Sequence, residues 1–416
     1  MCKGVKIFIL IIIMKTIIFW YKRIKRTLCN FVLYFLNKLL YNEIKVIGVT
    51  GTDGKTTTTY LIRNYINILN NKNKCGLIGT EIINDGKNEY KSVLTTPDPI
   101  VIFKNIVQMK KNDCTYCAME VSSHGIDQKR ANFIDFDCAI FTNISEEHLD
   151  YHKTFENYLN TKISFLKNNN KYIIINKDDK YYNYIQKELN KKHYTYGQQK
   201  SDFQITNMNF TLNGSIFDLI YNEQIYRFEI QLLGIHNIYN FTACLTYLIL
   251  NKYDINVLQT NSKYITPPPG RLEKIMNNIY VDYAHTPYAI SQMIKCFRKI
   301  TYKKIVIVFG AGGNRDTSKR KMMGKESSIA DIIIVTTDNP RFENPLNICN
   351  QIFPYIENDN KKIIIDRYDA LEYVIKNYIN EIILVMGKGN EQVMSVNGQN
   401  IIFNDKNVIL DIIKKL

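Results

Sequence analysis

The sequence predicts an α/β protein with two domains, each built around a mostly parallel sheet. From Ile44 onward, short apolar runs typical of strands alternate with helix-like stretches, which is the pattern of parallel α/β architecture. A glycine-rich loop follows the first run, and four later runs end in polar loops. The 416 residues, 45% of them hydrophobic, are enough for two packed cores. We therefore expect a central domain around a phosphate-binding loop (P-loop) and a C-terminal Rossmann-like α/β domain.

Residues 1–43 differ from the rest and are predicted to form an apolar, basic N-terminal arm. Ile7–Tyr21 is almost entirely apolar, the basic cluster Lys22–Arg26 follows, and Phe31–Tyr41 is again apolar. The first run is shorter than the ~20 residues of a membrane-spanning helix, and no small-residue cleavage site of a signal peptide follows it. Two alternatives remain: an interfacial anchor at the inner face of a membrane, or a helical arm packed on the globular body.

The glycine-rich segment Gly48–Thr59 predicts a nucleotide site. It follows the predicted strand Ile44–Val49 and precedes a predicted helix, Thr57–Asn70, which is the order that a phosphate-binding loop requires. Its backbone N–H groups can face phosphate oxygens, Lys55 can reach the terminal phosphates, and the Thr56 hydroxyl can hold magnesium. We therefore expect the chain to bind ATP and Mg²⁺.

Polar residues follow the next strands, predicted at Tyr116–Glu120, Cys138–Phe141 and Tyr172–Ile175. Glu120 ends its strand, where its carboxylate can reach magnesium at Thr56. Residues 142–150 follow the second strand and include His148 and several acids. Because the carboxyl ends of parallel strands share one edge, these groups suggest a two-metal site for phosphoryl transfer. For His148 alone, a surface residue at a helix start is the alternative.

The chain changes character after the central strands. Phe203–Gln231 has short alternating runs with turns at Asn213-Gly214 and Asn222-Glu223, which predict antiparallel hairpins. The cluster Pro267–Gly270 cannot continue a helix. We therefore place a boundary there, giving a central domain at 44–267 and a C-terminal domain at 268–416.

Four apolar runs of the C-terminal domain each end in a polar loop. The runs are Ile279–Val281, Ile305–Phe309, Ile332–Val335 and Ile382–Met386. The loops contain Asp282–His285, Gly310–Gly313, Asp338–Arg341 and Gly387–Gly389. In a parallel sheet these loops meet at the carboxyl edge, where ligands of open α/β domains bind. The sequence therefore predicts a second binding site.

Composition argues against other classes of function. The formal charge is +15, but the lysines are scattered and no nucleic-acid-binding motif accompanies them, so we expect no nucleic-acid partner. The nine cysteines are dispersed, as reduced thiols of a cytosolic protein are. Cys114 and Cys117 form a single C-x-x-C without the second ligand pair that zinc needs.

The chain carries a series of motifs in a fixed order: the phosphate loop, Thr95-Thr96-Pro97, Glu120–His124, Glu147–His152, Gly234–Asn240, Gly270-Arg271, Asp282–Pro287 and Asp338–Arg341. From about Ile44 to the C-terminus this series resembles the Mur ligases, and within them the UDP-N-acetylmuramoyl-tripeptide synthetase (MurE) family. The resemblance implies a cytoplasmic, monomeric ATP-dependent ligase of peptidoglycan precursor synthesis. In that chemistry ATP phosphorylates a substrate carboxylate, and an amino acid's amine then attacks the acyl phosphate.

The resemblance also implies roles for individual residues. The implied catalytic residues are Lys55, Glu120, His148 and Lys162. The implied metal ligands are Thr56, Glu120, His148 and Lys162. The implied ATP-binding residues are Gly51, Thr52, Asp53, Gly54, Lys55, Thr56, Thr57, Asn237, Asn240 and Arg271. The implied acceptor-binding residues are Thr95, Thr96, Ser122, Gln128 and Arg130. Lys162 matches a lysine that the family carbamylates, which turns a cation into an anionic oxygen ligand; a solvated helix lysine is the alternative.

The same resemblance implies the amino acid that is added. The positions that match recognition of meso-diaminopimelate are Arg315, Asp338, Asn339, Pro340, Arg341, Gly387 and Glu391. An arginine can clamp a carboxylate with two hydrogen bonds, and Glu391 can pair with the distal ammonium. Lysine-adding relatives lack the arginine of Asp-Asn-Pro-Arg, so diaminopimelate is favoured over lysine. The expected acceptor is UDP-MurNAc-L-Ala-D-Glu.

The resemblance starts near Ile44, and the arm before it is too short for the N-terminal domain with which the family binds the uridine nucleotide. Either the uridine nucleotide is left largely without protein contacts, or the arm takes the place of that domain by holding the enzyme near the membrane, close to a lipid-linked substrate. Two alternative functions remain. One is a truncated Mur-type ligase using another carboxylate acceptor, lipid-linked or folylpolyglutamate-like. The other is a non-catalytic ATP-binding scaffold.

Overall fold

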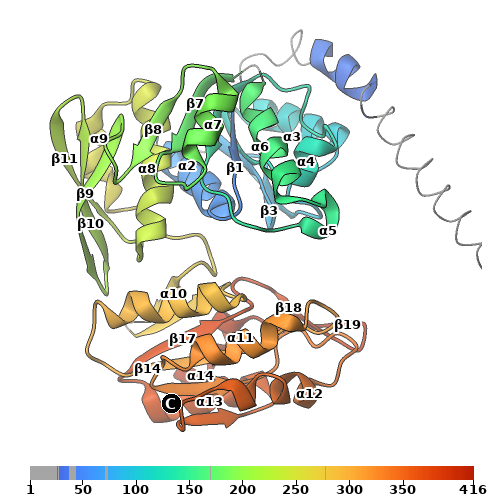
Figure 1. The fold of residues 1–416 in the computed structure, drawn as a ribbon, viewed down its shortest axis with the longest axis vertical. Coiled ribbons are helices and arrows are strands. Elements are labelled where there is room, and N and C mark those ends of the chain that lie inside the picture. Colours follow the sequence, from blue (N-terminus) through green and yellow to red (C-terminus); the bar gives the residue numbers. More distant parts are fainter. Residues whose placement is uncertain (1–25, 27, 37–43, 71–73, 169, 277) are drawn as a thin grey trace, which may run out of the picture. The chain divides into compact units, whose positions relative to one another are not determined.

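A computed structural model describes residues 26, 28–36, 44–70, 74–168, 170–276 and 278–416. The apolar run expected at Ile7–Tyr21 and most of the basic cluster lie outside these residues. The chain divides into two compact units (Figure 1). The first contains the described residues up to Met208, with Ile216–Ile230 and Ile235–Ile265; the second contains Asn209–Ser215, Gln231–Gly234 and Thr266–Leu416. The second unit thus takes in two short segments that precede residue 267.

The first unit is built on a sheet in the order β11-β10-β9-β8-β7-β6-β1-β5-β2-β3-β4. Its strands are β1 (Lys45–Thr50), β2 (Cys75–Ile78), β3 (Ile82–Asn84), β4 (Glu89–Lys91), β5 (Tyr116–Glu120), β6 (Phe136–Phe141), β7 (Asn170–Asn176), β8 (Tyr194–Gly197), β9 (Phe203–Thr211), β10 (Gly214–Tyr221) and β11 (Gln224–Ile230). The pairs from β2 through β5, β1, β6, β7 and β8 to β9 are parallel. The four strands expected from apolar runs are confirmed, and β1 lies between β5 and β6, so their carboxyl ends meet.

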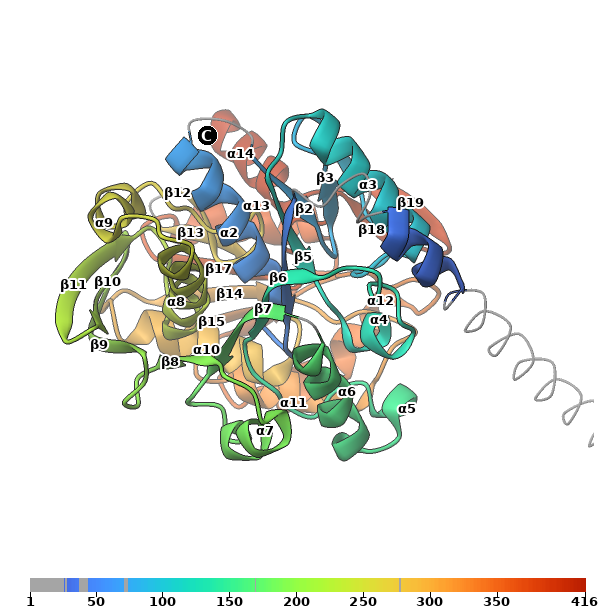
Figure 2. The same cartoon turned by 90° about the horizontal axis from the view of Figure 1, so that it is seen from above.

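Helices cover both faces of this sheet. They are α2 (Lys55–Asn70), α3 (Pro99–Lys111), α4 (Ser123–Asp127), α5 (Leu149–His152), α6 (Phe155–Lys167), α7 (Tyr182–Leu189), α8 (Ile235–Leu250) and α9 (Ile255–Ser262). Helices α2 and α8 pack side by side, whereas α3, α6 and α7 supply the core of the opposite face (Figure 2). Residues 28–36 are also helical, and Leu33 packs into that second core.

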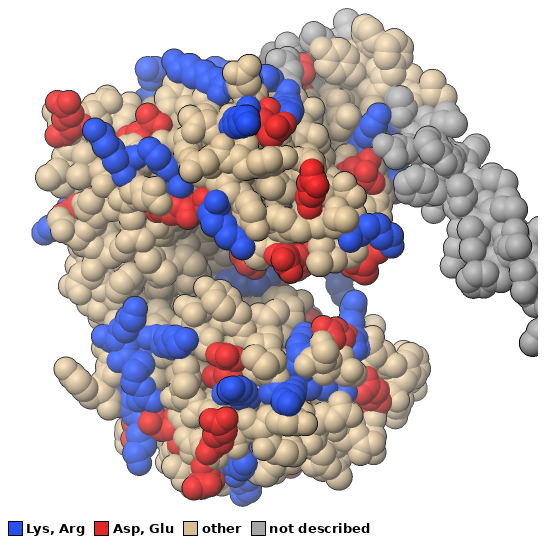
Figure 3. Space-filling model, viewed as in Figure 1, with Lys and Arg blue, Asp and Glu red and all other residues tan. Residues whose placement is uncertain are grey.

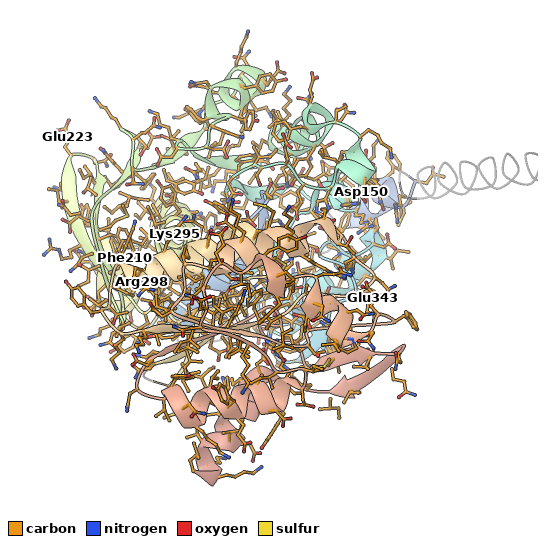
Figure 4. All side chains as sticks on the ribbon, turned by 60° about the horizontal axis from the view of Figure 1, so that its bottom comes forward. Asp150, Phe210, Glu223, Lys295, Arg298 and Glu343 are labelled. Atoms are coloured by element: carbon orange, nitrogen blue, oxygen red, sulfur yellow. The ribbon has the colours of Figure 1, made fainter. Side chains whose placement is uncertain are left out.

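The predicted hairpins are confirmed in β9–β11. These strands are neighbours in the sheet, and only two residues join each pair, a connection that antiparallel strands allow and parallel strands do not. At the second turn, Asn222 and Glu223 have φ of +48° and +64°, the left-handed values of a type I′ turn. Glu223 marks the tip of this turn in Figure 4.

The second unit is a six-stranded sheet in the order β12-β13-β17-β14-β15-β16. Its strands are β12 (Glu273–Met276), β13 (Ile279–Asp282), β14 (Ile305–Phe309), β15 (Ile332–Val335), β16 (Lys361–Ile363) and β17 (Ile382–Met386), and a separate hairpin has β18 (Val393–Val396) and β19 (Gln399–Ile402). All pairs from β13 to β16 are parallel, and β12 is antiparallel. The four apolar runs expected in this region are confirmed as neighbouring parallel strands.

The four central strands, β13, β17, β14 and β15, are buried on both faces, which explains why they are continuous apolar runs. The helices are α10 (Pro287–Arg298), α11 (Ser318–Ser327), α12 (Pro345–Asn350), α13 (Arg367–Tyr378) and α14 (Asp405–Lys415), with a 3₁₀ turn at Phe353–Tyr355. In β14, Ile307 and Phe309 join the core with α10 and α11, whereas Val306 and Val308 join the core with α13 and α14.

Charged side chains are mixed over the surface. On the face shown in Figure 3, Lys and Arg are interspersed with Asp and Glu on both units. Among the described residues, no helix combines the length and apolar character needed to cross a membrane.

Candidate active site

The loop between β1 and α2 has the geometry of a phosphate-binding loop. Gly54 has φ of +84°, a left-handed value that a residue with a side chain rarely adopts. The Lys55 ammonium folds back over the loop and donates to the carbonyl oxygens of Gly51 (2.9 Å) and Thr52 (2.7 Å). Because the first N–H groups of a helix lack intrahelical partners, the start of α2 can present them to a phosphate.

The segment after β6 holds this loop in place. The backbone N–H groups of Thr52 and Asp53 donate to the carbonyl oxygen and side-chain oxygen of Asn143, each at 2.9 Å. The Thr142 hydroxyl donates to the carbonyl oxygen of Asp53 at 2.6 Å. The residues after β6 therefore hold the loop through these three hydrogen bonds.

Glu120, at the end of β5, joins the phosphate loop to the predicted acceptor residues. Its carboxylate is buried and accepts hydrogen bonds from the hydroxyls of Thr56 (3.0 Å) and Thr80 (2.9 Å). Its backbone carbonyl accepts from the Thr96 hydroxyl at 2.9 Å, and the Thr80 hydroxyl lies 3.2 Å from that of Thr95. Carboxylate and hydroxyl oxygens are ligands that Mg²⁺ prefers, so Thr56 and Glu120 fit that ion.

His148 takes no part in the hydrogen bond between Thr56 and Glu120, and its ring centre lies 4.9 Å from that of His124. It precedes α5 with φ of +56°, its side chain is 43% exposed, and its Nε2 lies 3.5 Å from a Glu147 oxygen. Across the described part of the chain, no three His, Cys, Asp or Glu side chains cluster closely enough to hold a metal ion. Mg²⁺ commonly takes one or two protein ligands together with water and substrate phosphates, and such a site requires no cluster of that kind.

Lys162 is buried beneath the phosphate loop. Its side chain is 1% exposed, its Nζ donates to the Gly51 carbonyl at 2.7 Å, and it lies 4.8 Å from the centre of the Tyr158 ring. The alternative of a solvated helix lysine is therefore wrong. Burial, reinforced by the nearby Lys55 ammonium, holds the pKa of Lys162 well below its usual range, which favours the uncharged amine.

Four of the predicted acceptor residues form one hydrogen-bonded group. The hydroxyls of Thr96 and Ser122 are 3.1 Å apart, and Ser122 caps the start of α4 by accepting from a backbone N–H. Arg130 donates to the Thr96 carbonyl (2.7 Å) and to the side-chain oxygen of Gln128 (2.8 Å). The structure thus brings these residues together beside Glu120.

Of the two asparagines predicted to bind ATP, Asn240 packs against the phosphate loop and Asn237 lies next to Asn240. Asn240 accepts from the Thr58 hydroxyl at 3.3 Å and lies 3.4 Å from the side chain of Asn237. A Cβ at Gly54 would come within 2.4 Å of Asn240 Oδ1. Thr57, on the same helix as Thr58, is buried.

In the second unit, the loops after β15 and β17 meet at the predicted amino-acid site. Asn339 donates to Glu391 Oε2 (2.8 Å) and to Asp338 Oδ1 (3.0 Å). The fully buried Lys388 donates to the same Glu391 oxygen at 2.9 Å. Gly387 has φ of +112°, and a Cβ there would lie 2.5 Å from Asp338 Oδ2. Glu391 therefore already has one cationic neighbour.

Arg341 occupies the same edge of the second sheet. Its Nη1 donates to the Gly313 carbonyl at 2.7 Å, and its backbone has φ of +54°. A Cβ at Gly312 would lie 2.9 Å from Arg341 Nη1 and 3.9 Å from Cγ of the exposed Arg315. A Cβ at Gly313 would meet the Pro340 carbonyl oxygen at 1.9 Å. The glycine loop is thus packed against the Asp-Asn-Pro-Arg loop, with two arginines at the junction.

Arg271 is part of the second unit, where its guanidinium stacks 4.3 Å from the centre of the Tyr283 ring. Beside it, Asp282 accepts from the backbone N–H groups of Leu272 (2.6 Å) and Ala284 (2.7 Å). Burial raises the pKa of Asp282 to about 6 even though Arg271 and the two N–H groups act in the opposite direction.

Sequence reasoning missed two residues of these sites. Thr80 bonds both oxygens of Glu120, through its N–H (2.8 Å) and its hydroxyl (2.9 Å), but it lies in a turn without a recognisable motif. Lys388 stands inside the Gly-Lys-Gly sequence, which marked the loop without indicating that the lysine pairs with Glu391. The signal that could have found this ion pair is the spacing, since Lys388 stands three residues before Glu391.

Comparisons with known proteins agree with this geometry. The model of the Mur ligase middle domain matches residues 49–248, and that of the Mur ligase glutamate ligase domain matches residues 270–389. The UDP-N-acetylmuramoyl-L-alanyl-D-glutamate–2,6-diaminopimelate ligase 1 of Clostridium acetobutylicum is 35% identical over 384 residues, 90% of this chain and 79% of that protein. The corresponding ligase of Aquifex aeolicus is 36% identical over 378 residues, covering 89% and 78%.

A solved structure of a UDP-N-acetylmuramoyl-L-alanyl-D-glutamate–2,6-diaminopimelate ligase is similar in fold, with a TM-score of 0.68 and 29% identity over 92% of this chain and 81% of that one. The family models together span both units, and the relatives match along most of their length. The chain belongs to the Mur ligase family.

Proposed function

We propose that this chain is an ATP-dependent ligase that adds meso-diaminopimelate to UDP-MurNAc-L-Ala-D-Glu in peptidoglycan precursor synthesis. The observation that carries the proposal is the position of Glu120. Its carboxylate bonds Thr56 of the phosphate loop, and its backbone bonds Thr96 of the acceptor group. An acceptor carboxylate held at Thr96 would therefore lie beside the ATP phosphates that this loop would bind. Transfer of the terminal phosphoryl group to the carboxylate requires this proximity.

In the first step, an acceptor carboxylate oxygen attacks the terminal phosphorus of ATP, and ADP leaves. Lys55 and the N–H groups at the start of α2 would stabilise the charge on the phosphates. Thr56 and Glu120 would hold Mg²⁺, which supplies further neutralisation of the phosphate charge when it is bound. The product is an acyl phosphate and ADP.

In the second step, the amine of the amino acid attacks the acyl carbon, phosphate leaves, and the nitrogen loses a proton to give the amide. Arg341 and Arg315 would receive a carboxylate of diaminopimelate, and Glu391 its distal ammonium. Asp338, Asn339, Pro340 and Gly387 shape this pocket in the proposal. Because Lys388 already neutralises one Glu391 oxygen, the free oxygen is the one that would meet the ammonium.

Lys162 is proposed to act as a carbamate. An uncharged amine is the form that reacts with carbon dioxide, and the burial of Lys162 favours that form. The resulting anion would lie next to Gly51 of the phosphate loop, where it would offer an oxygen ligand to a second Mg²⁺, with His148 offering a ring nitrogen.

A trapping experiment tests the acyl phosphate. The protein is incubated with ATP, Mg²⁺, UDP-MurNAc-L-Ala-D-Glu and hydroxylamine, without amino acid. Hydroxylamine attacks an acyl phosphate as an amine does, so we expect an acceptor hydroxamate and equal amounts of ADP. ADP release without hydroxamate would contradict the mechanism. In parallel reactions with a lipid-linked or a folate acceptor, hydroxamate formed with one of these alone would favour a different acceptor.

A second proposal concerns assembly and location: we infer that the enzyme acts as a monomer and contacts the inner face of the membrane through its N-terminal segment. Helical residues 28–36 expose Leu28 and Phe31 (66% each), Val32 (55%) and Phe35 (51%). These positions form one stripe of the helix, and basic residues precede them in the sequence. Sedimentation with anionic vesicles should capture the protein, and Phe31→Ser with Phe35→Ser should release it; equal capture of both would contradict this proposal.

A further inference from the structure

Arg26 reaches the predicted acceptor group from the N-terminal segment. Its Nε and Nη2 donate to Asp98 Oδ1 (3.1 and 2.8 Å), and its Nη1 donates to Gln128 Oε1 at 2.8 Å. Arg130 donates to the same Gln128 oxygen, also at 2.8 Å. Two guanidinium groups thus share one amide oxygen, although 102 residues separate Arg26 from Gln128.

The segment that carries Arg26 is docked next to this group. Asn30 is buried and donates to the Lys129 carbonyl at 2.6 Å, and Leu33 packs into the core of the first unit. The Arg26 side chain keeps 20% of its surface exposed. It is therefore held in position while remaining open to a ligand.

The cluster is short of negative charge. Two arginines face a single carboxylate, Asp98, which is half exposed. Arg130 is 8% exposed, and its Nε is buried without a hydrogen-bond acceptor, with Asp98 Oδ1 lying 3.9 Å away. Burial lowers the pKa of Arg130, Asp98 opposes that effect and Arg26 adds to it. An added anion would supply what this cluster lacks.

We propose that Arg26 is an acceptor-binding residue, which together with Arg130 receives an anionic group of the acceptor next to Gln128. This inference rests on the proposed function. The acceptor carries two kinds of oxyanion, peptide carboxylates and the diphosphate, and a pair of guanidinium forks suits either. On binding, the oxyanion would take the N–H groups that now converge on Gln128 and Asp98.

The test uses the full chain and steady-state kinetics with two acceptors, UDP-MurNAc-L-Ala-D-Glu and MurNAc-L-Ala-D-Glu, which lacks the diphosphate. Arg26→Gln removes the positive charge, and Arg26→Lys keeps the charge without the two-pronged guanidinium. Arg227→Gln is the control, because Arg227 is largely exposed and pairs with Asp218 at the β11 end of the same sheet. Since a hydrogen bond to a charged group contributes on the order of a 10- to 100-fold change in affinity, Arg26→Gln should raise the acceptor KM by that factor. The ATP KM and the thermal midpoint should stay unchanged, Arg26→Lys should recover part of the loss, and Arg227→Gln should behave as the wild type.

The two acceptors identify the oxyanion. If Arg26→Gln raises the KM for both acceptors, the proposal is supported and the ligand is a carboxylate. If it raises the KM for the nucleotide acceptor alone, the proposal is supported and the ligand is the diphosphate. An unchanged acceptor KM, or a loss confined to thermal stability, overturns it. If the wild type turns over neither acceptor, the proposed function fails, and calorimetric binding of UDP-MurNAc-L-Ala-D-Glu then decides the role of Arg26. Weaker binding to Arg26→Gln than to the wild type supports that role. Equal binding to both proteins, or no binding to either, overturns it.

Discussion

Replacement of Arg341 by methionine should change the choice of amino acid more than it changes the reaction. The Arg341 guanidinium uses Nη1 to bond the Gly313 carbonyl at 2.7 Å, and its other N–H groups can form a two-point contact with a carboxylate. The backbone bond between Arg341 N and the Ser395 carbonyl (2.9 Å) does not depend on the side chain. The loop should therefore keep its path in Arg341→Met.

The magnitude follows from the contact that is lost. A hydrogen bond to a charged group contributes about 1.5–3 kcal/mol, and each 1.4 kcal/mol corresponds to about a tenfold change. The KM for meso-diaminopimelate should therefore rise by about 10- to 150-fold. Lysine has no distal carboxylate, so its kcat/KM should change by less than about threefold.

The assay is initial-rate phosphate release with each amino acid at saturating ATP and acceptor. Arg298→Met provides a control in the same unit. Arg298, labelled in Figure 4, is the last residue of α10 and forms a partly exposed ion pair with Asp331. This control should retain wild-type kinetics. An equal loss with diaminopimelate and lysine would refute the reasoning, since it would show that Arg341 supports the loop and does not read the substrate.

Three further predictions concern the fold and the nucleotide. Arg367→Met leaves the fully buried Asp405 carboxylate without its partner and should cost about 3–5 kcal/mol of stability, measured by denaturant unfolding, with partial recovery in the double variant with Asp405→Leu. Gly54→Ala forces a side chain onto φ of +84° and should weaken ATP binding by about tenfold or more, whereas Gly86→Ala, at φ of +94°, should leave it unchanged in the same titration. The pKa of Asp282 is about 6 in the folded state against about 3.9 in an unfolded chain, so the folded state holds the proton more tightly and its stability should rise as pH falls from 6 to 4. As the pH falls over this range, the thermal midpoint of the wild type should rise relative to that of Asp282→Asn, which lacks the titrating carboxyl group.

The sequence was most informative where one local pattern decides the structure. β5, β14, β15 and β17 match their expected bounds because they are buried on both faces and read as continuous apolar runs. By contrast, β3 and β4 escaped prediction. They are three residues each, and all three residues of Glu89–Lys91 are exposed, so neither strand carries an alternating pattern from which it could be predicted.

The candidate sites show the same contrast between features that a local pattern predicts and features that depend on tertiary packing. The phosphate loop is a contiguous motif, and the residues around Glu120 follow from strand ends that a parallel sheet brings together. Contacts that depend on tertiary packing could not be foreseen: the burial of Lys162 under Gly51, the bonds of Thr80 to Glu120, and the approach of Arg26 to Gln128. Each joins segments between 40 and 111 residues apart, and no spacing rule connects them.

The central claim is that the chain forms an amide bond between an acceptor carboxylate and diaminopimelate at the expense of ATP. The most direct measurement is mass spectrometry of the product formed from UDP-MurNAc-L-Ala-D-Glu, ATP, Mg²⁺ and either meso-diaminopimelate or lysine, with phosphate release measured in the same reaction. The account predicts the diaminopimelate tripeptide with one phosphate per amide, and little product with lysine. Phosphate release without an amide, or no reaction with either amino acid, would contradict it.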